Sequence, residues 1–233
     1  MTTFVLVHGA WHGGWCYDEV AALIRAEGHP VFTPTLTGLA ERSEELTPDV
    51  GLERHILDVV AVIDEYELRD IVLVGHSYGG LVVEGAADLR PEAIAKLAFI
   101  DGLVAEGETL SAAPRAQMLD AFAALIDPDR PWLVRPLPAS YFGLTGEAAD
   151  LVDARCTPHP LRALQDQVVL TGASATIRNR TYIVAQAPAG PAFQRTADRL
   201  ASDGDWTVVG IAGGHDLMID SAPALARTLM TLA

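Results

Sequence analysis

Short runs of apolar residues recur along the chain, and each run ends in small or polar residues. Residues in these runs are apolar at almost every position instead of alternating with polar ones, which is typical of parallel strands buried on both faces. The five clearest runs, and a weaker sixth, are residues 4–7, 71–74, 97–100, 182–185 and 206–211, and then 31–32. The pattern therefore predicts a largely parallel sheet.

Stretches with helical periodicity separate these runs. In residues 52–66, for example, the apolar side chains recur at intervals of three and four, so that they share one helix face. The other predicted helices are residues 18–27, 81–89 and 222–232. Strands that alternate with helices indicate βαβ units and an α/β fold with a mostly parallel sheet flanked by helices.

Residues 106–175 interrupt this alternation, because they contain seven prolines and only short amphipathic pieces. The simplest interpretation is a helical insertion between two strands of the sheet that forms a cap over its carboxyl-terminal edge. We therefore expect a core made of residues 1–105 and 176–233 and a helical cap subdomain made of residues 106–175.

Composition and charge narrow the class of protein. A chain of 233 residues, half of them hydrophobic, suits one sizeable domain with a large core. Its 31 acidic residues against 16 basic ones give a net charge of −15, which argues against nucleic acid or anionic membranes as partners. The start of the chain has no signal-peptide pattern, and no uncharged run approaches the ~18 residues of a membrane span. These features predict a soluble, cytoplasmic protein. They leave open whether the protein forms a homodimer.

Two cysteines, Cys16 and Cys156, lie far apart in the sequence and form no metal-binding or redox motif. We expect two buried or half-buried thiols in a reducing compartment, and no metal site.

The strongest chemical signal is Gly75-His76-Ser77-Tyr78-Gly79-Gly80, which follows a predicted buried strand and opens a predicted helix. A serine on a strained turn between a strand and a helix needs small neighbours two residues away on each side, and glycine meets that need. The turn lifts the hydroxyl above the sheet at the amino-terminal end of the helix, where negative charge is favoured. Ser77 is therefore the candidate nucleophile.

The loop after the first strand reads His8-Gly9-Ala10-Trp11. An oxyanion hole needs two converging backbone N–H groups, one from the residue after the nucleophile and one from a loop that follows an early strand. Tyr78 and Ala10 are the candidates for these two donors.

A catalytic base has to arrive late in the chain on a loop next to the serine, and Gly213-Gly214-His215 follows the last predicted strand. His215 is therefore the candidate base. The histidines His8, His12 and His76 flank the site but lie too near their own strands to serve as the base. We expect the remaining ones, in helical or proline-flanked contexts, to be solvated; these are His29, His55 and His159.

Together these motifs resemble the α/β-hydrolase superfamily, in the branch that contains plant methylesterases, hydroxynitrile lyases and bacterial esterases similar to them. The residues that carry the likeness are 5–15, 33–38, 72–80 and 213–215, while the cap is only loosely similar. The resemblance implies a Ser–His–acid triad, an oxyanion hole formed by Ala10 and Tyr78, and no cofactor.

The acid of the triad departs from the usual pattern of that branch, where it follows the strand assigned here to residues 182–185. In this chain the following loop, residues 186–191, contains no carboxylate. Some members of the superfamily carry the acid one strand earlier, where this chain has Asp101, and Asp101 is therefore our candidate. Asp216, Asp198 and a dyad without an acid stay open as alternatives.

The residue after His215 separates two activities of the branch. Hydroxynitrile lyases that resemble this chain have a lysine there to stabilise cyanide, whereas this chain has Asp216, whose negative charge would repel cyanide. The sequence therefore favours a hydrolase over a lyase.

Aromatic residues near the motifs and in the predicted cap suggest an apolar substrate pocket. Trp11, His12, Trp15 and Phe142 are the candidate binding residues. Packing between cap helices is the alternative role for Phe142 and for four further candidates, Met118, Phe122, Trp132 and Tyr141. The motifs contain no cluster of Arg or Lys, so we expect a small uncharged ester, lactone or thioester. The leading hypothesis is a serine esterase of the carboxylesterase type. A secondary-metabolism enzyme that decarboxylates, cyclises or opens lactones, and a non-catalytic small-molecule receptor, are the alternatives.

Overall fold

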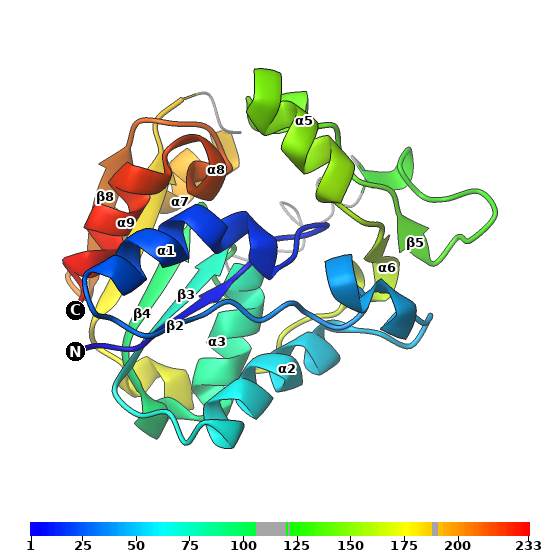
Figure 1. Ribbon diagram of the computed structural model, residues 1–233. Helices are drawn as coiled ribbons and strands as arrows, with labels where there is room; N and C mark the ends of the chain where they lie inside the picture. The colour runs from blue at the N-terminus through cyan, green and yellow to red at the C-terminus, as the bar shows by residue number, and fades with distance from the viewer. Residues whose placement is uncertain (106–119, 121, 188–190) are drawn as a thin grey trace.

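The computed structural model describes residues 1–105, 120, 122–187 and 191–233 (Figure 1). Its centre is a six-stranded sheet with the strand order β2-β1-β3-β4-β7-β8, in which all neighbouring strands run parallel. In chain order these strands are β1 (Phe4–Val7), β2 (Val31–Phe32), β3 (Ile71–His76), β4 (Ile94–Ile100), β7 (Arg180–Ala185) and β8 (Trp206–Ile211). The α/β-hydrolase fold predicted from the sequence is confirmed.

The strands predicted from apolar runs all exist, and the structure lengthens three of them. Every residue of β1, β3 and β7 is buried, as continuous apolar runs require of strands covered on both faces. The added residues include Arg180 and Thr181, which are polar and therefore hid the start of β7 from a search for apolar runs.

Helices cover both faces of the sheet. α1 packs against α9 and α2 packs against α3, and Figure 1 shows the two pairs on opposite sides of the strands. The helices of this core are α1 (Asp18–Ala26), α2 (Leu52–Glu65), α3 (Gly79–Leu89), α7 (Pro191–Ala201), α8 (Leu217–Asp220) and α9 (Ala222–Met230), with short 3₁₀ segments η1 (Gly14–Tyr17), η2 (Ala40–Glu45) and η3 (Pro91–Ala93). The sequence did not predict α7 or α8. Within the described ranges, no helix combines the length and the apolar character that crossing a bilayer requires.

The chain between β4 and β7 leaves the sheet, and Figure 1 shows α5 and β5 away from the six strands. Its elements are β5 (Leu133–Val134) paired antiparallel with β6 (His159–Pro160), the helices α5 (Gly146–Arg155) and α6 (Leu161–Gln165), and the 3₁₀ segments η5 (Ala139–Phe142) and η6 (Ala173–Thr176). Much of the first part of the predicted cap, residues 106–119 and 121, lies outside the described residues. The division into core and cap therefore stays a prediction.

A buried carboxyl group supports the helix that follows Ser77. Glu84 on α3 is fully buried, its Oε2 accepts the Ala105 N–H at 2.5 Å, and its Oε1 lies 3.8 Å from the Arg180 guanidinium. Burial raises the pKa of this carboxyl to about 7, and the Ala105 N–H and Arg180 only partly offset that effect. The folded protein therefore binds the Glu84 proton more tightly than the unfolded chain does.

This shift predicts a pH-dependent contribution to stability. The contribution of Glu84 is complete below its usual pKa of 4.5 and is lost as the pH rises through about 7. Glu84→Gln keeps an oxygen for the Ala105 N–H but cannot ionise, so its stability relative to the wild type should rise between pH 5 and pH 8.5, by on the order of 2 to 3 kcal/mol. Urea unfolding at both pH values measures this difference. Glu92→Gln, at an exposed position, is the matched control, and parallel stability curves for Glu84→Gln and the wild type would contradict the prediction.

Candidate active site

Ser77 lies on the tight turn between β3 and α3, with a positive φ of 51°. Such a conformation is strained for a serine and is held by its surroundings. A Cβ atom at Gly75 would lie 2.5 Å from the Gly79 carbonyl oxygen, and one at Gly79 would lie 2.5 Å from the His8 carbonyl oxygen. The Ser77 N–H also donates to the Ile100 carbonyl at 3.1 Å, and its own carbonyl accepts the Leu103 N–H at 2.9 Å. The glycines that the sequence singled out are thus required by close backbone packing.

The loop after β1 lies directly against this turn. A Cβ atom at Gly9 would come within 3.0 Å of the Ser77 Cβ and 2.8 Å of the His76 Nδ1. This contact places the loop that carries Ala10 beside the turn that carries Ser77 and Tyr78. The role of Ala10 and Tyr78 as oxyanion donors stays a prediction.

His215 follows β8, and its ring meets the carboxylate that follows β4. Its Nδ1 lies 3.1 Å from the Asp101 Oδ2, and Asp101 is fully buried. The other carboxylate oxygen of Asp101 accepts the Ala185 N–H at 2.9 Å. Because a carboxylate can only accept, Nδ1 carries the proton and Nε2 is left with a lone pair. The arrangement can orient the ring and can stabilise an imidazolium on it.

Aromatic rings surround the imidazole of His215. Phe193 on α7 stacks on it with ring centroids 4.7 Å apart, and Phe142 from η5 lies nearly parallel at 5.8 Å. His76, the neighbour of Ser77, lies at 4.6 Å and donates from its Nε2 to the His215 carbonyl at 3.0 Å. These contacts tie the loop of His215 to the turn of Ser77. The sequence did not single out Phe193, because α7 itself was not predicted.

Comparison with known proteins decides the family of the chain. The model of a family described as the alpha/beta hydrolase family matches residues 4–228. The chain belongs to this family.

Two curated relatives show what kind of hydrolase this is. The chain is 39% identical to a carbendazim hydrolyzing esterase of Nocardioides sp. (strain SG-4G), with 100% of both chains covered. It is 26% identical to esterase PIR7B of Oryza sativa subsp. japonica, over 94% of this chain and 91% of the relative. The hydrolase is therefore an enzyme that cleaves esters, and its resemblance to the methylesterase-like branch is confirmed. This result disfavours the receptor hypothesis.

A solved structure supports the fold. Methylketone synthase I from tomato, in complex with 2-tridecanone, superposes with a TM-score of 0.83. The two chains are 23% identical, and the superposition covers 99% of this chain and 97% of the other. At that level of identity the likeness concerns the architecture alone.

In the described residues, neither rival carboxylate is hydrogen-bonded to His215. Asp216 is fully buried, and its carboxylate faces the His12 Nε2 at 3.4 Å. Asp198 lies on an exposed part of α7 and accepts a hydrogen bond from Gln194 at 2.8 Å. The geometry therefore favours Asp101 among the three.

Two histidines expected to be solvated are instead buried, so that expectation was wrong. His55 and His159 are both fully buried. The His55 Nε2–H donates to the Thr37 carbonyl at 2.9 Å, which leaves Nδ1 to accept the Tyr78 hydroxyl at 2.8 Å. Burial lowers the pKa of His55 to about 4, so it stays neutral in this network. The reason for the error is that β6 carries His159 to within 5.7 Å of His55 on α2, between ring centroids, so that the two rings pack against each other. His29, the third, is half-buried at the edge of the fold.

The predicted substrate-binding residues form one aromatic cluster next to His215. Trp11, His12, Trp15 and Phe142 are each less than a tenth exposed, and neighbouring rings lie 5.5 to 6.3 Å apart. Phe122 is buried and packs edge-on against Trp11, whereas Tyr141 is exposed. Met118 lies outside the described residues. Whether these rings contact substrate stays a prediction.

One group of side chains in the described part of the hydrolase has the spacing of a metal site. The ligand atoms of His76, His215 and Asp216 lie within 4.8 Å of one another. The His76 Nε2 is engaged with the His215 carbonyl and the His215 Nδ1 with Asp101, so the two imidazoles already have hydrogen-bond partners. We interpret the group as support for His215 and assign it no metal.

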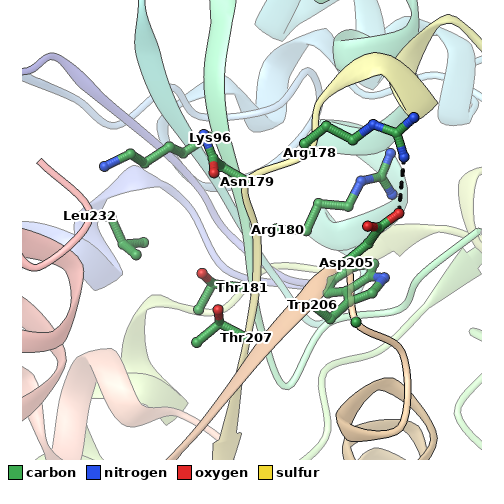
Figure 2. A pocket seen from close by; sticks show the side chains of 10 residues that line it. Lys96, Arg178, Asn179, Arg180, Thr181, Asp205, Trp206, Thr207 and Leu232 are labelled. Atoms are coloured by element: carbon green, nitrogen blue, oxygen red, sulfur yellow. Dashed lines mark hydrogen bonds and ion pairs between the residues drawn. The ribbon is translucent and has the colours of Figure 1, made fainter.

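A separate hollow of about 320 Å³ lies at the other edge of the sheet (Figure 2). It is lined by residues at the amino-terminal ends of β4, β7 and β8, whereas Ser77, Asp101 and His215 follow carboxyl-terminal ends. Figure 2 shows Arg178 paired with Asp205, at 3.0 Å. The hollow is therefore distinct from the candidate active site.

Proposed function

We propose that this hydrolase is a serine carboxylesterase that cleaves a small uncharged ester, lactone or thioester through Ser77, His215 and Asp101. The observation that carries the proposal is the hydrogen bond of 3.1 Å between the His215 Nδ1 and a buried Asp101 carboxylate, beside a serine on a strained turn. An ordinary serine hydroxyl is a weak nucleophile, and an oriented imidazole is what activates it.

In the first step the His215 Nε2 takes the proton of the Ser77 hydroxyl while its oxygen attacks the carbonyl carbon of the ester. The imidazolium that forms is stabilised by Asp101. The negative oxygen of the tetrahedral intermediate accepts hydrogen bonds from the backbone N–H groups of Ala10 and Tyr78. When the intermediate collapses, His215 returns the proton to the leaving alcohol, and an acyl group stays on Ser77.

In the second step His215 takes a proton from water, and the resulting hydroxide attacks the acyl-enzyme. The same two N–H groups stabilise the second tetrahedral intermediate. Its collapse releases the acid and returns the proton from His215 to Ser77. The sequence of steps consumes one water and needs no cofactor.

The substrate class follows from the chemistry around the site. The motif stretches 8–15, 75–80 and 213–216 contain no Arg or Lys, so they offer no permanent cation to an anionic substrate. The aromatic cluster beside His215 favours a substrate with an aromatic or aliphatic body. p-Nitrophenyl esters of short acids and carbendazim, the compound in the name of the 39% identical relative, are the first substrates to test.

A fluorophosphonate probe tests the proposed nucleophile. The probe reacts with a serine that a neighbouring base activates, so we expect one adduct per chain, on the peptide that contains Ser77, and loss of ester turnover in proportion to labelling. Mass spectrometry of the digested protein locates the adduct. Denatured protein and the exposed-serine variant Ser202→Ala are the controls. An adduct on another serine, or full activity after complete labelling of Ser77, would refute the assignment.

A second candidate function is a non-hydrolytic reaction on the same scaffold, as the secondary-metabolism hypothesis holds. The position of Asp101 after β4, where the methylesterase-like branch usually has its acid after the next strand, motivates it, and methylketone synthase I, which shares the fold, suggests the assay. Assays with β-keto acids, which follow carbon dioxide release, separate it from ester hydrolysis. Labelling of Ser77 together with carbon dioxide release and no turnover of any simple ester would favour this reading over the esterase.

A further inference from the structure

A buried pair of charges joins two loops of the candidate active site. The His12 Nε2 lies 3.4 Å from the Asp216 Oδ2, and each side chain is at most 2% exposed. His12 belongs to the loop of the candidate oxyanion donor Ala10, and Asp216 directly follows His215. The mechanism proposed above uses neither side chain.

One hydrogen bond and one ion-pair contact indicate that the ring of His12 is an imidazolium. Its Nδ1 lies 2.8 Å from the Ala10 carbonyl oxygen, which can only accept, so Nδ1 carries a proton. Its Nε2 faces the Asp216 carboxylate, which favours a second proton there. Near the ring lie also the Cys156 thiol and the His76 ring at 6.3 Å, and the Trp15 and Phe142 rings pack against it at 5.5 and 5.9 Å.

The charges of the pair agree with this geometry. Burial opposes charge on both partners, but their mutual attraction holds the pKa of His12 well above its usual value and lowers the pKa of Asp216 to about 2. The His76 Nε2 lies 3.7 Å from the Asp216 Oδ1, but burial holds the pKa of His76 well below its usual value, so this ring is neutral. Within the described part of the chain the carboxylate makes no conventional hydrogen bond, so the facing His12 imidazolium compensates its buried charge.

Two histidines, His8 and His12, hold the peptide groups at both sides of Ala10. The His12 Nδ1–H holds the Ala10 carbonyl, and the His8 Nδ1 donates to the Gly9 carbonyl at 2.8 Å while its Nε2 accepts the Leu36 N–H. The Gly9 carbonyl and the Ala10 N–H belong to one planar trans peptide, in which they point in opposite directions. His8 therefore fixes the direction of the Ala10 N–H, and His12 holds the next peptide group of the same loop.

Asp216 is one of three residues that hold the loop of His215, together with Asp220 and His76. The Gly214 N–H is bound by Asp220 at 2.6 Å, and the His215 carbonyl is bound by His76 at 3.0 Å. Asp216 adds an electrostatic contact across to the opposite loop. A buried ion pair is weak support for overall stability, because the loss of hydration offsets the attraction, but it can specify one arrangement of two segments.

We propose that His12 and Asp216 are positioning residues whose buried ion pair holds the Ala10 loop and the His215 loop in the relative placement that ester cleavage needs. This inference rests on the proposed function, because the proposed function assigns Ala10 its role as oxyanion donor and His215 its role as base. It gives His12 a role other than the substrate binding expected from its place in the sequence.

Asp216→Asn tests the pair, because the amide has the size of the carboxylate but no charge. We expect kcat for a p-nitrophenyl ester to fall about 10- to 100-fold with KM within twofold, since misplaced catalytic groups weaken the transition state more than substrate binding. If the pair acts as a unit, the double variant His12→Gln/Asp216→Asn loses no more than the worse single variant. Asp64→Asn, which removes an exposed contact with Arg90, is the matched control and should keep wild-type kcat.

Histidine ¹⁵N NMR provides a readout that does not depend on activity. At pH 8.5 the wild type should show an imidazolium that is absent from His12→Gln and becomes neutral in Asp216→Asn. Absence of that signal in the wild type, or unchanged kcat in a folded Asp216→Asn variant, overturns the proposal. Failure of the fluorophosphonate probe to label Ser77 in the wild type is a different result, which refutes the proposed function and leaves the NMR signal as the test of the pair.

Discussion

Ser77→Ala is expected to lower kcat for p-nitrophenyl esters by about five to six orders of magnitude, because no other group in the proposed mechanism can form the acyl-enzyme. The variant should fold as the wild type does. Alanine has the same Cβ as serine, so it bears the same strain at the φ of 51°, and only the hydroxyl is removed. Steady-state rates, together with the thermal midpoint of unfolding, measure both expectations.

Ser202→Ala provides the matched control, since Ser202 is exposed and its hydroxyl donates to the Arg199 carbonyl nearby in the chain. It should leave kcat within twofold of the wild type. If Ser77→Ala, folded and free of wild-type protein, retained a tenth of the activity, the acyl-enzyme mechanism would be wrong.

The sheet could be predicted because a strand covered on both faces is apolar at every position. This signal identified all six strands of the central sheet. The helices were predicted from a different signal, an apolar stripe along one face. That signal missed α7, because its buried residues Ala197 and Leu200 are separated by polar ones and the apolar stripe is narrow. Phe193, which stacks on His215, was missed together with this helix.

The candidate triad could be assembled from the sequence because the ends of parallel strands meet at one edge of a sheet. Ser77, Asp101 and His215 each follow such an end, and the hydrogen bond from His215 to Asp101 joins two of them. The burial of His55 and the contact between His12 and Asp216 had no comparable signal. Both depend on which loop covers which side chain, and helical periodicity does not encode that.

Asp101→Asn should lower kcat by about four orders of magnitude, and the local hydrogen bonds give the reason. The Ala185 N–H donates to one oxygen of Asp101 at 2.9 Å, so an asparagine would keep its carbonyl oxygen there. Its NH₂ group would then face the His215 Nδ1, which would have to accept. The ring proton moves to Nε2, the atom that must take the proton of Ser77, and the base is held in the wrong tautomer.

The same variant separates the candidate acids. The rate of fluorophosphonate labelling at Ser77 should fall along with kcat, because both need the serine to be activated by His215. Asp198→Asn, which alters only the contact with Gln194 on exposed α7, should change neither rate. An Asp101→Asn variant within tenfold of the wild type would instead support a dyad of Ser77 and His215. A larger loss of kcat in Asp198→Asn than in Asp101→Asn would identify Asp198 as the acid. The hydrogen bond between His215 and Asp101 predicts the opposite result.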